Sequence, residues 1–363
     1  MSLWKQIYNE LLPKVLHRTS YRTVHVSIVI FIFVLPILCN ASLAVPRAQA
    51  ESADQMSRCA QIEDEAEGLK CYDELVGHQE KQEVVAEPQV VEKASHKPEP
   101  LSYLSRLWDL EEDSRREEYA ITTHRANYIL PFSYVHSPNE QPIKEASPDK
   151  DLKNAEVKLQ FSFKVKLWQD IFNKNMDLWF GYTQLSLWQF YNFDDSSPFR
   201  ETNYEPELLL NLRTSYEVLG FKGRFINLGI NHQSNGRSEP LSRSWNRVVA
   251  NFGFERDNLA LILNTWLRIP ENEDEDDNPD IDDYMGYGQI WLYYFLKDHR
   301  LGFMCRNNLH FDENRSTVQI EWSFPLIEHV SGYIQYFYGY GESLLDYNTR
   351  ISRIGLGFIV KDW

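Results

Sequence analysis

The stretch "AEVKLQFSFKVKL", residues 155 to 167, decides the fold because apolar and polar side chains alternate along its whole length. Every odd position is apolar, and every even position is Glu, Lys, Gln or Ser. Successive side chains of a β-strand point to opposite faces, so this period of two predicts a strand with one dry and one polar face. "ELLLNLRTSYEV", residues 207 to 218, largely repeats the pattern.

Strand length and loop length then predict the fold class. These strands exceed the five or six residues usual in globular proteins, and they suit the roughly 9 to 11 residues of a tilted bilayer crossing. Connections after the even-numbered segments are short, and several of the others are long. We therefore predict an all-β protein, a twelve-stranded antiparallel transmembrane β-barrel of the bacterial outer membrane, with N- and C-termini periplasmic. A soluble β-sandwich is the alternative. The twelve segments begin near residues 126, 155, 176, 205, 224, 245, 257, 284, 300, 315, 330 and 348.

The composition excludes one class of partner. The chain has 363 residues and a formal net charge of -16. Proteins that bind nucleic acid use stripes of Lys and Arg to displace counterions from phosphates. We expect no nucleic-acid binding, because this acidic chain has no such stripe.

The N-terminal part of the sequence differs from the rest. "VSIVIFIFVLPILC", residues 26 to 39, follows several basic residues and precedes the small residues "AQA" at 48 to 50. This order predicts a signal peptide over residues 1 to 50. A membrane anchor is the alternative, although the run is shorter than the roughly 20 residues that a spanning helix needs.

Residues 51 to 120 are predicted to form a periplasmic extension ahead of a barrel domain over residues 121 to 363. Cys59 and Cys71 would meet an oxidising compartment after export, which favours a disulfide between them. The Pro- and Glu-rich residues 80 to 100 predict a flexible tether.

One strand carries polar residues on its dry face. In "FINLGINHQSN", residues 225 to 235, His232 and Ser234 share a face with Ile230. The returning strand puts Asn246 on its own apolar face, and the hairpin brings it roughly opposite His232, at a cross-strand distance of about 5 Å. Polar groups that face lipid cost several kcal/mol unless they bond to one another.

These three residue types match an activated nucleophile. Ser234 would attack, His232 would take its proton, and Asn246 would fix the imidazole tautomer. Because Asn246 is neutral, it orients the imidazole but offers less than a carboxylate to the imidazolium. The alternative is that all three are polar residues at the level of the lipid headgroups.

Five motifs resemble outer membrane phospholipase A, a family of twelve-stranded barrels of Gram-negative bacteria. The resemblance covers about residues 120 to 363, and it implies a calcium-dependent enzyme that hydrolyses acyl esters of phospholipids and is active as a homodimer. The motifs are "YTQLSLWQFYN" (182–192), "SSPFRETNYEPEL" (196–208), "NHQSNGRSEPLSRSWNR" (231–247), "DDNPDIDDYMGYGQ" (276–289) and "YGYGESLLDYN" (338–348).

The resemblance also implies roles for single residues. The family's catalytic His, Ser and Asn fall on His232, Ser234 and Asn246. The backbone N–H of Gly236, with calcium-bound water, would stabilise the oxyanion. The calcium ligands fall on Arg237 and Ser242, joined by Ser196 of the partner subunit.

Three further residues follow from the same resemblance. A second calcium site is expected at Glu239, where the family has Asp, with Asp277 as its partner, and the longer side chain puts that site in doubt. Gln184 falls in the dimer-interface strand, and lining of the barrel interior is its alternative role. The acidic run over residues 271 to 283 is interpreted mostly as a solvated external loop. A passive porin or a structural barrel remains the alternative function.

Overall fold

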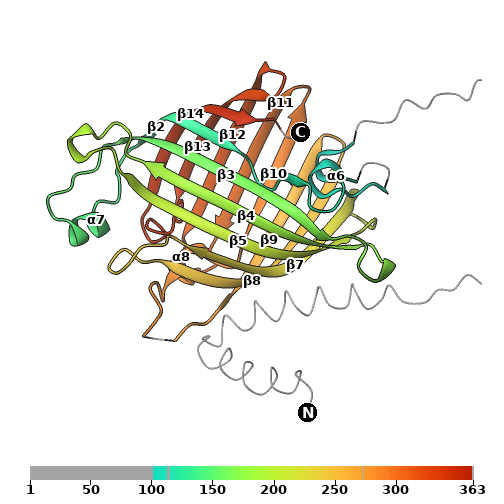
Figure 1. Cartoon of the computed structure of the whole chain (residues 1–363), viewed down its shortest axis with the longest axis horizontal. Helices are drawn as coiled ribbons and strands as arrows, with labels where there is room; N and C mark the ends of the chain where they lie inside the picture. Colours follow the sequence, from blue (N-terminus) through green and yellow to red (C-terminus); the bar gives the residue numbers. More distant parts are fainter. Residues whose placement is uncertain (1–100, 113–114, 273, 362–363) are drawn as a thin grey trace, which may run out of the picture. The chain divides into compact units, whose positions relative to one another are not determined.

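Long antiparallel strands make up most of what the computed structural model describes, residues 101–112, 115–272 and 274–361. The sheet of this part has 14 strands, of which the short β1 (Ile121–Thr123) and β6 (Glu217–Val218) lie off the ring. The remaining twelve close into a barrel through pairing of β2 with both β14 and β3 (Figure 1). The predicted twelve-stranded barrel is confirmed. Its strands are β2 (Tyr128–Val135), β3 (Ala155–Trp168), β4 (Met176–Trp188), β5 (Phe199–Arg213), β7 (Phe221–Ser234), β8 (Ser244–Arg256), β9 (Leu259–Ile269), β10 (Gly288–Leu296), β11 (His299–Asn307), β12 (Ser316–Ile327), β13 (Val330–Gly339) and β14 (Ile351–Val360).

The alternating faces of the strands show which side of the wall is polar. On β3, the Lys164 side chain is 0% exposed, whereas Phe161 is 54% exposed. Polar side chains therefore face the barrel interior and apolar ones face outward, as in a membrane barrel. A soluble sandwich packs its apolar faces together instead, so that alternative is wrong.

Buried ion pairs hold the interior together. Arg200 donates to Glu156 at 2.7 Å and to both carboxylate oxygens of Asp346 at 3.0 and 2.9 Å. Arg353 contacts Glu156 at 2.7 Å and Glu342 at 2.9 Å. These contacts join β3, β5 and β14 to the loop over residues 340–350. A cavity of about 270 Å³ remains inside the barrel.

Two strands begin four or more residues away from the positions that the sequence pattern predicts. β5 begins at Phe199 rather than near residue 205. The polar residues that resemble a loop here include Arg200, whose buried ion pairs extend the strand. β10 begins at Gly288 rather than near residue 284, because α8 (Ile281–Met285) occupies the preceding residues and buries Ile281.

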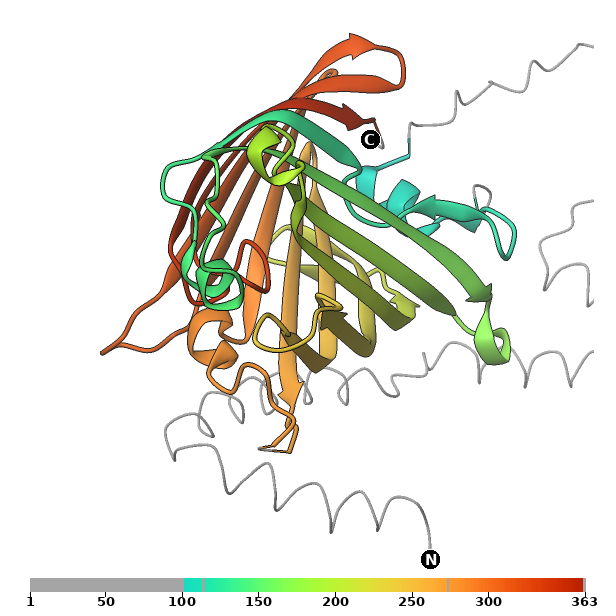
Figure 2. The same cartoon turned by 60° about the vertical axis from the view of Figure 1, so that its left-hand side comes forward.

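The two ends of the barrel differ in their connections. The links after β8, β10 and β12 are two residues each, at 257–258, 297–298 and 328–329, whereas residues 136–154, 235–243 and 270–287 form long loops at the opposite end. The long-loop end carries α7 (Gln141–Ala146) and α8 (Figures 1 and 2). The short links are those that the sequence predicts.

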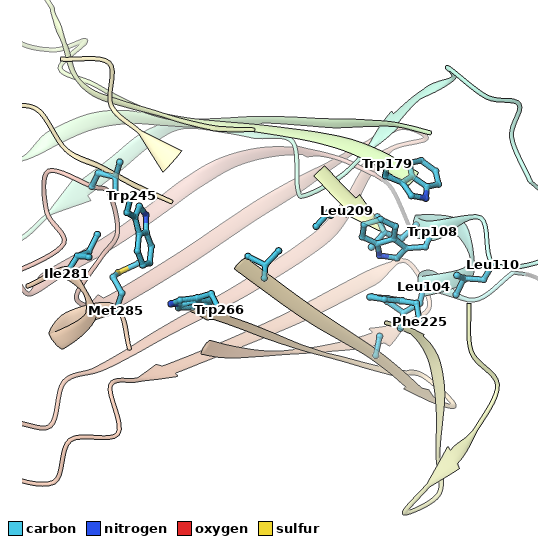
Figure 3. Close-up of a cluster of buried hydrophobic side chains, with 14 of the residues drawn as sticks. Leu104, Trp108, Leu110, Trp179, Leu209, Phe225, Trp245, Trp266, Ile281 and Met285 are labelled. Carbon is cyan, nitrogen blue, oxygen red and sulfur yellow. The ribbon is translucent and has the colours of Figure 1, made fainter. Parts of the chain in front are cut away.

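The segment before β1, which includes α6, packs inside the barrel at the end with the short links. Trp108, at the end of α6 (Tyr103–Trp108), meets Trp179 of β4 edge to face with ring centroids 5.8 Å apart, and Phe225 lies beside them (Figure 3). The described part of the predicted extension thus contributes to the core, because its Leu and Trp side chains are buried. None of the helices in the described residues is long and apolar enough to span a membrane.

Several predictions about the N-terminal part lie outside the described residues. These are the signal peptide over residues 1 to 50, the Cys59 and Cys71 disulfide, and the tether over residues 80 to 100.

Candidate active site

His232 and Ser234 lie near the long-loop end of β7, on the outer face of the barrel wall. Their neighbours on that face, Leu228 and Ile230, are 46% and 57% exposed. Asn231, on the opposite face, is buried and lines the interior cavity. The two polar side chains therefore point away from the interior, on the face that the alternation of the sequence predicts.

Asn246 of β8 lies directly across from His232. The two residues are register partners, and His232 Nδ1 lies 2.8 Å from Asn246 Oδ1. A carbonyl oxygen can only accept, so the imidazole donates from Nδ1. Nε2 then carries no proton and is the ring atom that can accept one from a hydroxyl.

Glu271 is a member of this cluster that the sequence argument missed. Asn246 Nδ2 donates to Glu271 Oε1 at 2.7 Å. Burial raises the pKa of the Glu271 carboxyl above its ordinary value, and the hydrogen bond from Asn246 acts in the opposite direction. Strand register could have located Glu271. Asn246 pairs with Ile269 of β9, and Glu271, two positions later, falls on the same face as Ile269.

Gly236 is the second residue of the loop between β7 and β8. Its φ of +63° lies in the left-handed region, and a Cβ there would approach the Tyr204 ring to 3.2 Å. Glycine is the residue that adopts this conformation at little cost. The backbone N–H of Gly236 is thus placed two residues after Ser234, in an exposed part of the loop.

Two buried asparagines, also missed from sequence, hold this loop. Asn235 donates to the Leu241 carbonyl at 2.7 Å and accepts from the Arg243 backbone at 3.0 Å. Asn278 accepts from the Ser244 backbone at 3.0 Å, which ties the 270–287 loop to the start of β8. Asn side chains often bond to nearby backbone in this way, but their partners cannot be read from the sequence.

The residues expected at calcium sites fall into two groups. Ser242 donates to Asp277 at 2.6 Å. Hydrogen bonding with Asp277 raises the pKa of Glu239 above its ordinary value, because neighbouring carboxyl groups resist ionising together. A cation would relieve this repulsion, and carboxylate and hydroxyl oxygens are ligands that calcium prefers, so these residues fit the ion. The described residues contain no group of three or more His, Cys, Asp or Glu that could hold a metal.

The other expected ligands lie beside the loop between β4 and β5. Ser196 is exposed, directly after η3 (Phe193–Asp195). Arg237 donates to the carbonyls of Phe199 and Arg200 at 3.0 and 2.7 Å, so the loop over residues 235–243 is fastened to the start of β5. A calcium site at these positions must therefore use hydroxyl and main-chain oxygens.

Gln184 lies in the middle of β4 on the outer face. Its neighbours Thr183 and Leu185 line the interior cavity, so Gln184 points the other way and does not line the interior. Its side chain accepts from the Tyr182 hydroxyl at 3.0 Å. Farther along the outer face, Trp188 stacks on Phe199 with ring centroids 5.1 Å apart.

Comparison with known proteins identifies the family. The family model described as Phospholipase A1 matches residues 104–360. The phospholipase A1 of Escherichia coli (strain K12) is 37% identical over 244 residues, which cover 67% of this chain and 82% of that protein.

Solved structures agree with the sequence match. The outer membrane phospholipase A from Escherichia coli superposes with a TM-score of 0.65 at 36% identity, over 72% of this chain and 98% of that chain. A Salmonella typhi outer membrane phospholipase, solved as a dimer with bound calcium, gives a TM-score of 0.65 at 35% identity, with the same coverage. This chain belongs to the phospholipase A1 family and is a phospholipid-hydrolysing enzyme of the outer membrane.

Proposed function

We propose that this enzyme cleaves acyl esters of phospholipids, at either glycerol position and in lysophospholipids, through Ser234, with calcium and as a homodimer. The observation that carries the proposal is the 2.8 Å contact between His232 and Asn246 on the outer face, two residues from Ser234. A base held in one tautomer, with a hydroxyl two residues away on the same face of the strand, supplies the groups that nucleophilic ester hydrolysis needs.

The reaction has two halves. Ser234 Oγ attacks the ester carbonyl carbon while His232 Nε2 takes the hydroxyl proton, and the Gly236 N–H donates to the oxyanion. The imidazolium then gives its proton to the departing alcohol oxygen, which leaves an acyl-enzyme. Water attacks that ester with His232 again as the base, and the fatty acid leaves as Ser234 regains its proton.

Calcium would be held by oxygens of Arg237, Ser242 and Ser196 of the partner subunit. Glu239 and Asp277 are the proposed pair for a second ion. When bound, calcium supplies positive charge beside the oxyanion, which a neutral backbone amide alone provides only in part. The Salmonella typhi relative, solved as a dimer with bound calcium, supports this assignment.

A dimer through the outer face of β4 would complete each site. Ser196 is exposed in the single chain, and Gln184 presents an amide that can pair with its twin across a two-fold axis. The exposed aromatic side chains of Phe190, just after β4, and Phe199, at the start of β5, offer an apolar surface to an acyl chain. Activity would then depend on association of two barrels.

The orientation of the barrel follows from its loops. Outer-membrane barrels have short periplasmic turns and long external loops, so we place the short links and both termini of the chain in the periplasm. The catalytic loop, at the long-loop end, then meets phospholipid in the outer leaflet. Buried ion pairs occupy part of the barrel interior, beside the cavity of about 270 Å³, and give no support to a passive porin.

Hydrolysis by refolded protein in detergent micelles tests the proposal. Ser234→Ala should lose nearly all ester hydrolysis, whereas Ser238→Ala, which removes an exposed hydroxyl from the same loop, should keep it. EGTA should abolish turnover of the unaltered protein, and calcium should restore it. Activity retained by Ser234→Ala would refute the assignment of Ser234 as the nucleophile. Turnover that EGTA does not change would refute the calcium requirement.

A further inference from the structure

The third member of the catalytic set is an amide, and an amide has two chemically different ends of nearly equal shape. Only the Oδ1 end of Asn246 can accept the proton of His232 Nδ1. If the amide turned over, Nδ2 would face the ring, and Nδ1 would have to accept. The ring proton would then lie on Nε2, which could no longer take a proton from Ser234.

Glu271 settles which end of the amide faces the imidazole. Its Oε1 lies 2.7 Å from Asn246 Nδ2. An ionised carboxylate has no proton to donate, so it accepts only from the Nδ2 end. We propose that Glu271 is a positioning residue that fixes the orientation of Asn246, and through it the tautomer of His232; this inference rests on the proposed function.

Glu271 also adds the negative charge that a neutral Asn lacks. Hydrogen bonds in a chain polarise one another, so a carboxylate on Nδ2 makes Oδ1 a stronger acceptor. The imidazolium that forms during attack by Ser234 is then stabilised through the amide. A Ser, His and Asn set with this fourth group gains part of what an Asp in the third position would supply.

The groups around Glu271 do not compete strongly with Asn246 for its carboxylate. Its side chain is 18% exposed, and the nearest cation, Arg268, lies 4.0 Å away. Arg268 makes its shorter contact, 2.5 Å, with Asp276. Asp276 and Asp277 are the acidic groups that act on Glu271 through space. The amide of Asn246 is therefore the short hydrogen-bond donor to this carboxylate among the described residues.

The first measurement compares two carboxylates of one loop in the full-length protein with calcium. Glu271→Gln should lower kcat by about tenfold, the size expected for losing a charged hydrogen bond. KM and the calcium concentration for half-activation should change by less than about twofold. Glu275→Gln removes an equal charge from an exposed position of the same loop and should leave kcat unchanged.

The second measurement tests whether Glu271→Gln raises kcat, instead of lowering it, when residue 246 is changed to Asp. In Asn246→Asp, the new carboxylate faces Glu271, and two like charges in contact cannot both ionise readily. Adding Glu271→Gln to this variant supplies an amide donor to Asp and should raise its kcat several-fold. The same substitution therefore lowers kcat beside Asn and raises it beside Asp. A residue that only supports the loop would lower kcat in both backgrounds.

The outcomes separate this inference from the function on which it rests. If Ser234→Ala is inactive but Glu271→Gln behaves like Glu275→Gln, the positioning role is wrong and the nucleophile stands. If Glu271→Gln lowers kcat equally in both backgrounds, Glu271 is structural and the inference is overturned. If Ser234→Ala stays active, the proposed function itself fails.

Discussion

The barrel wall holds polar groups on both faces, and the two sets are built differently. Inside, Glu156 lies between Arg200 and Arg353 at 2.7 Å from each, so each of these three charges has an opposite partner. Outside, Glu271, Asn246 and His232 form a single row of hydrogen bonds on the face that also carries Ser234. We expect the closed network to affect folding, and the row of hydrogen bonds, which lies on the face of the proposed nucleophile, to affect the reaction.

The two faces also differ in how removal of one member should act. A buried charge that loses its partner remains desolvated, and that cost falls on the stability of the folded state. An outer-face residue at the membrane boundary can reach water or headgroups when its partner is removed. We therefore expect interior substitutions to change unfolding and outer-face substitutions to change turnover.

The largest effect on unfolding is expected from Glu156→Leu. The change removes one of the two carboxylate partners of Arg200 and of Arg353 and leaves the buried network with excess positive charge. Breaking a buried ion pair costs about 3–5 kcal/mol. Denaturant unfolding in micelles should show this loss, while kcat of the folded fraction stays within about twofold. A large fall in kcat without loss of stability would contradict the division between the two faces.

Which residues face inward and which face outward can be predicted from the sequence, because this depends only on the order of neighbouring residues along a strand. Alternation in residues 155–167 assigns the faces of the wall, and the same period assigns His232 and Ser234 to the outer one. The interior partners could not be predicted, because Arg200 and Asp346 lie 146 residues apart and meet only when the barrel closes. The role of Glu271 could not be predicted for a similar reason. The acidic run that contains it resembles a solvated loop, and only the pairing of β8 with β9 brings Glu271 to Asn246.

A smaller effect, on turnover alone, is expected from Asn246→Ala. The imidazole loses its orienting acceptor but keeps Nε2, so kcat should fall by about ten- to a hundredfold, at least as far as in Glu271→Gln, with unfolding nearly unchanged. Kinetics and denaturant unfolding on the same preparation measure both. A collapse as complete as that of Ser234→Ala would show that Asn246 does more than orient the ring.

The smallest effect is expected where a charge pair lies in solvent. Lys361 Nζ lies 2.8 Å from Asp298 Oδ1 beside the short links, and the Asp298 side chain is 65% exposed. Hydrogen bonding to Lys361 lowers the pKa of Asp298, so the contribution is present above the ordinary Asp pKa and is lost as the pH falls below it.

Lys361→Ala should move the thermal midpoint at neutral pH by less than about 1 °C, because water and salt screen an exposed pair. Both this pair and the interior network join a side-chain cation to a carboxylate, and burial is the main difference between them. If Lys361→Ala destabilised the barrel as much as Glu156→Leu, pairing of charges by itself, rather than desolvation inside the wall, would account for the stability of the interior. Melting curves of both variants in one buffer, at low and at high salt, decide between the two causes.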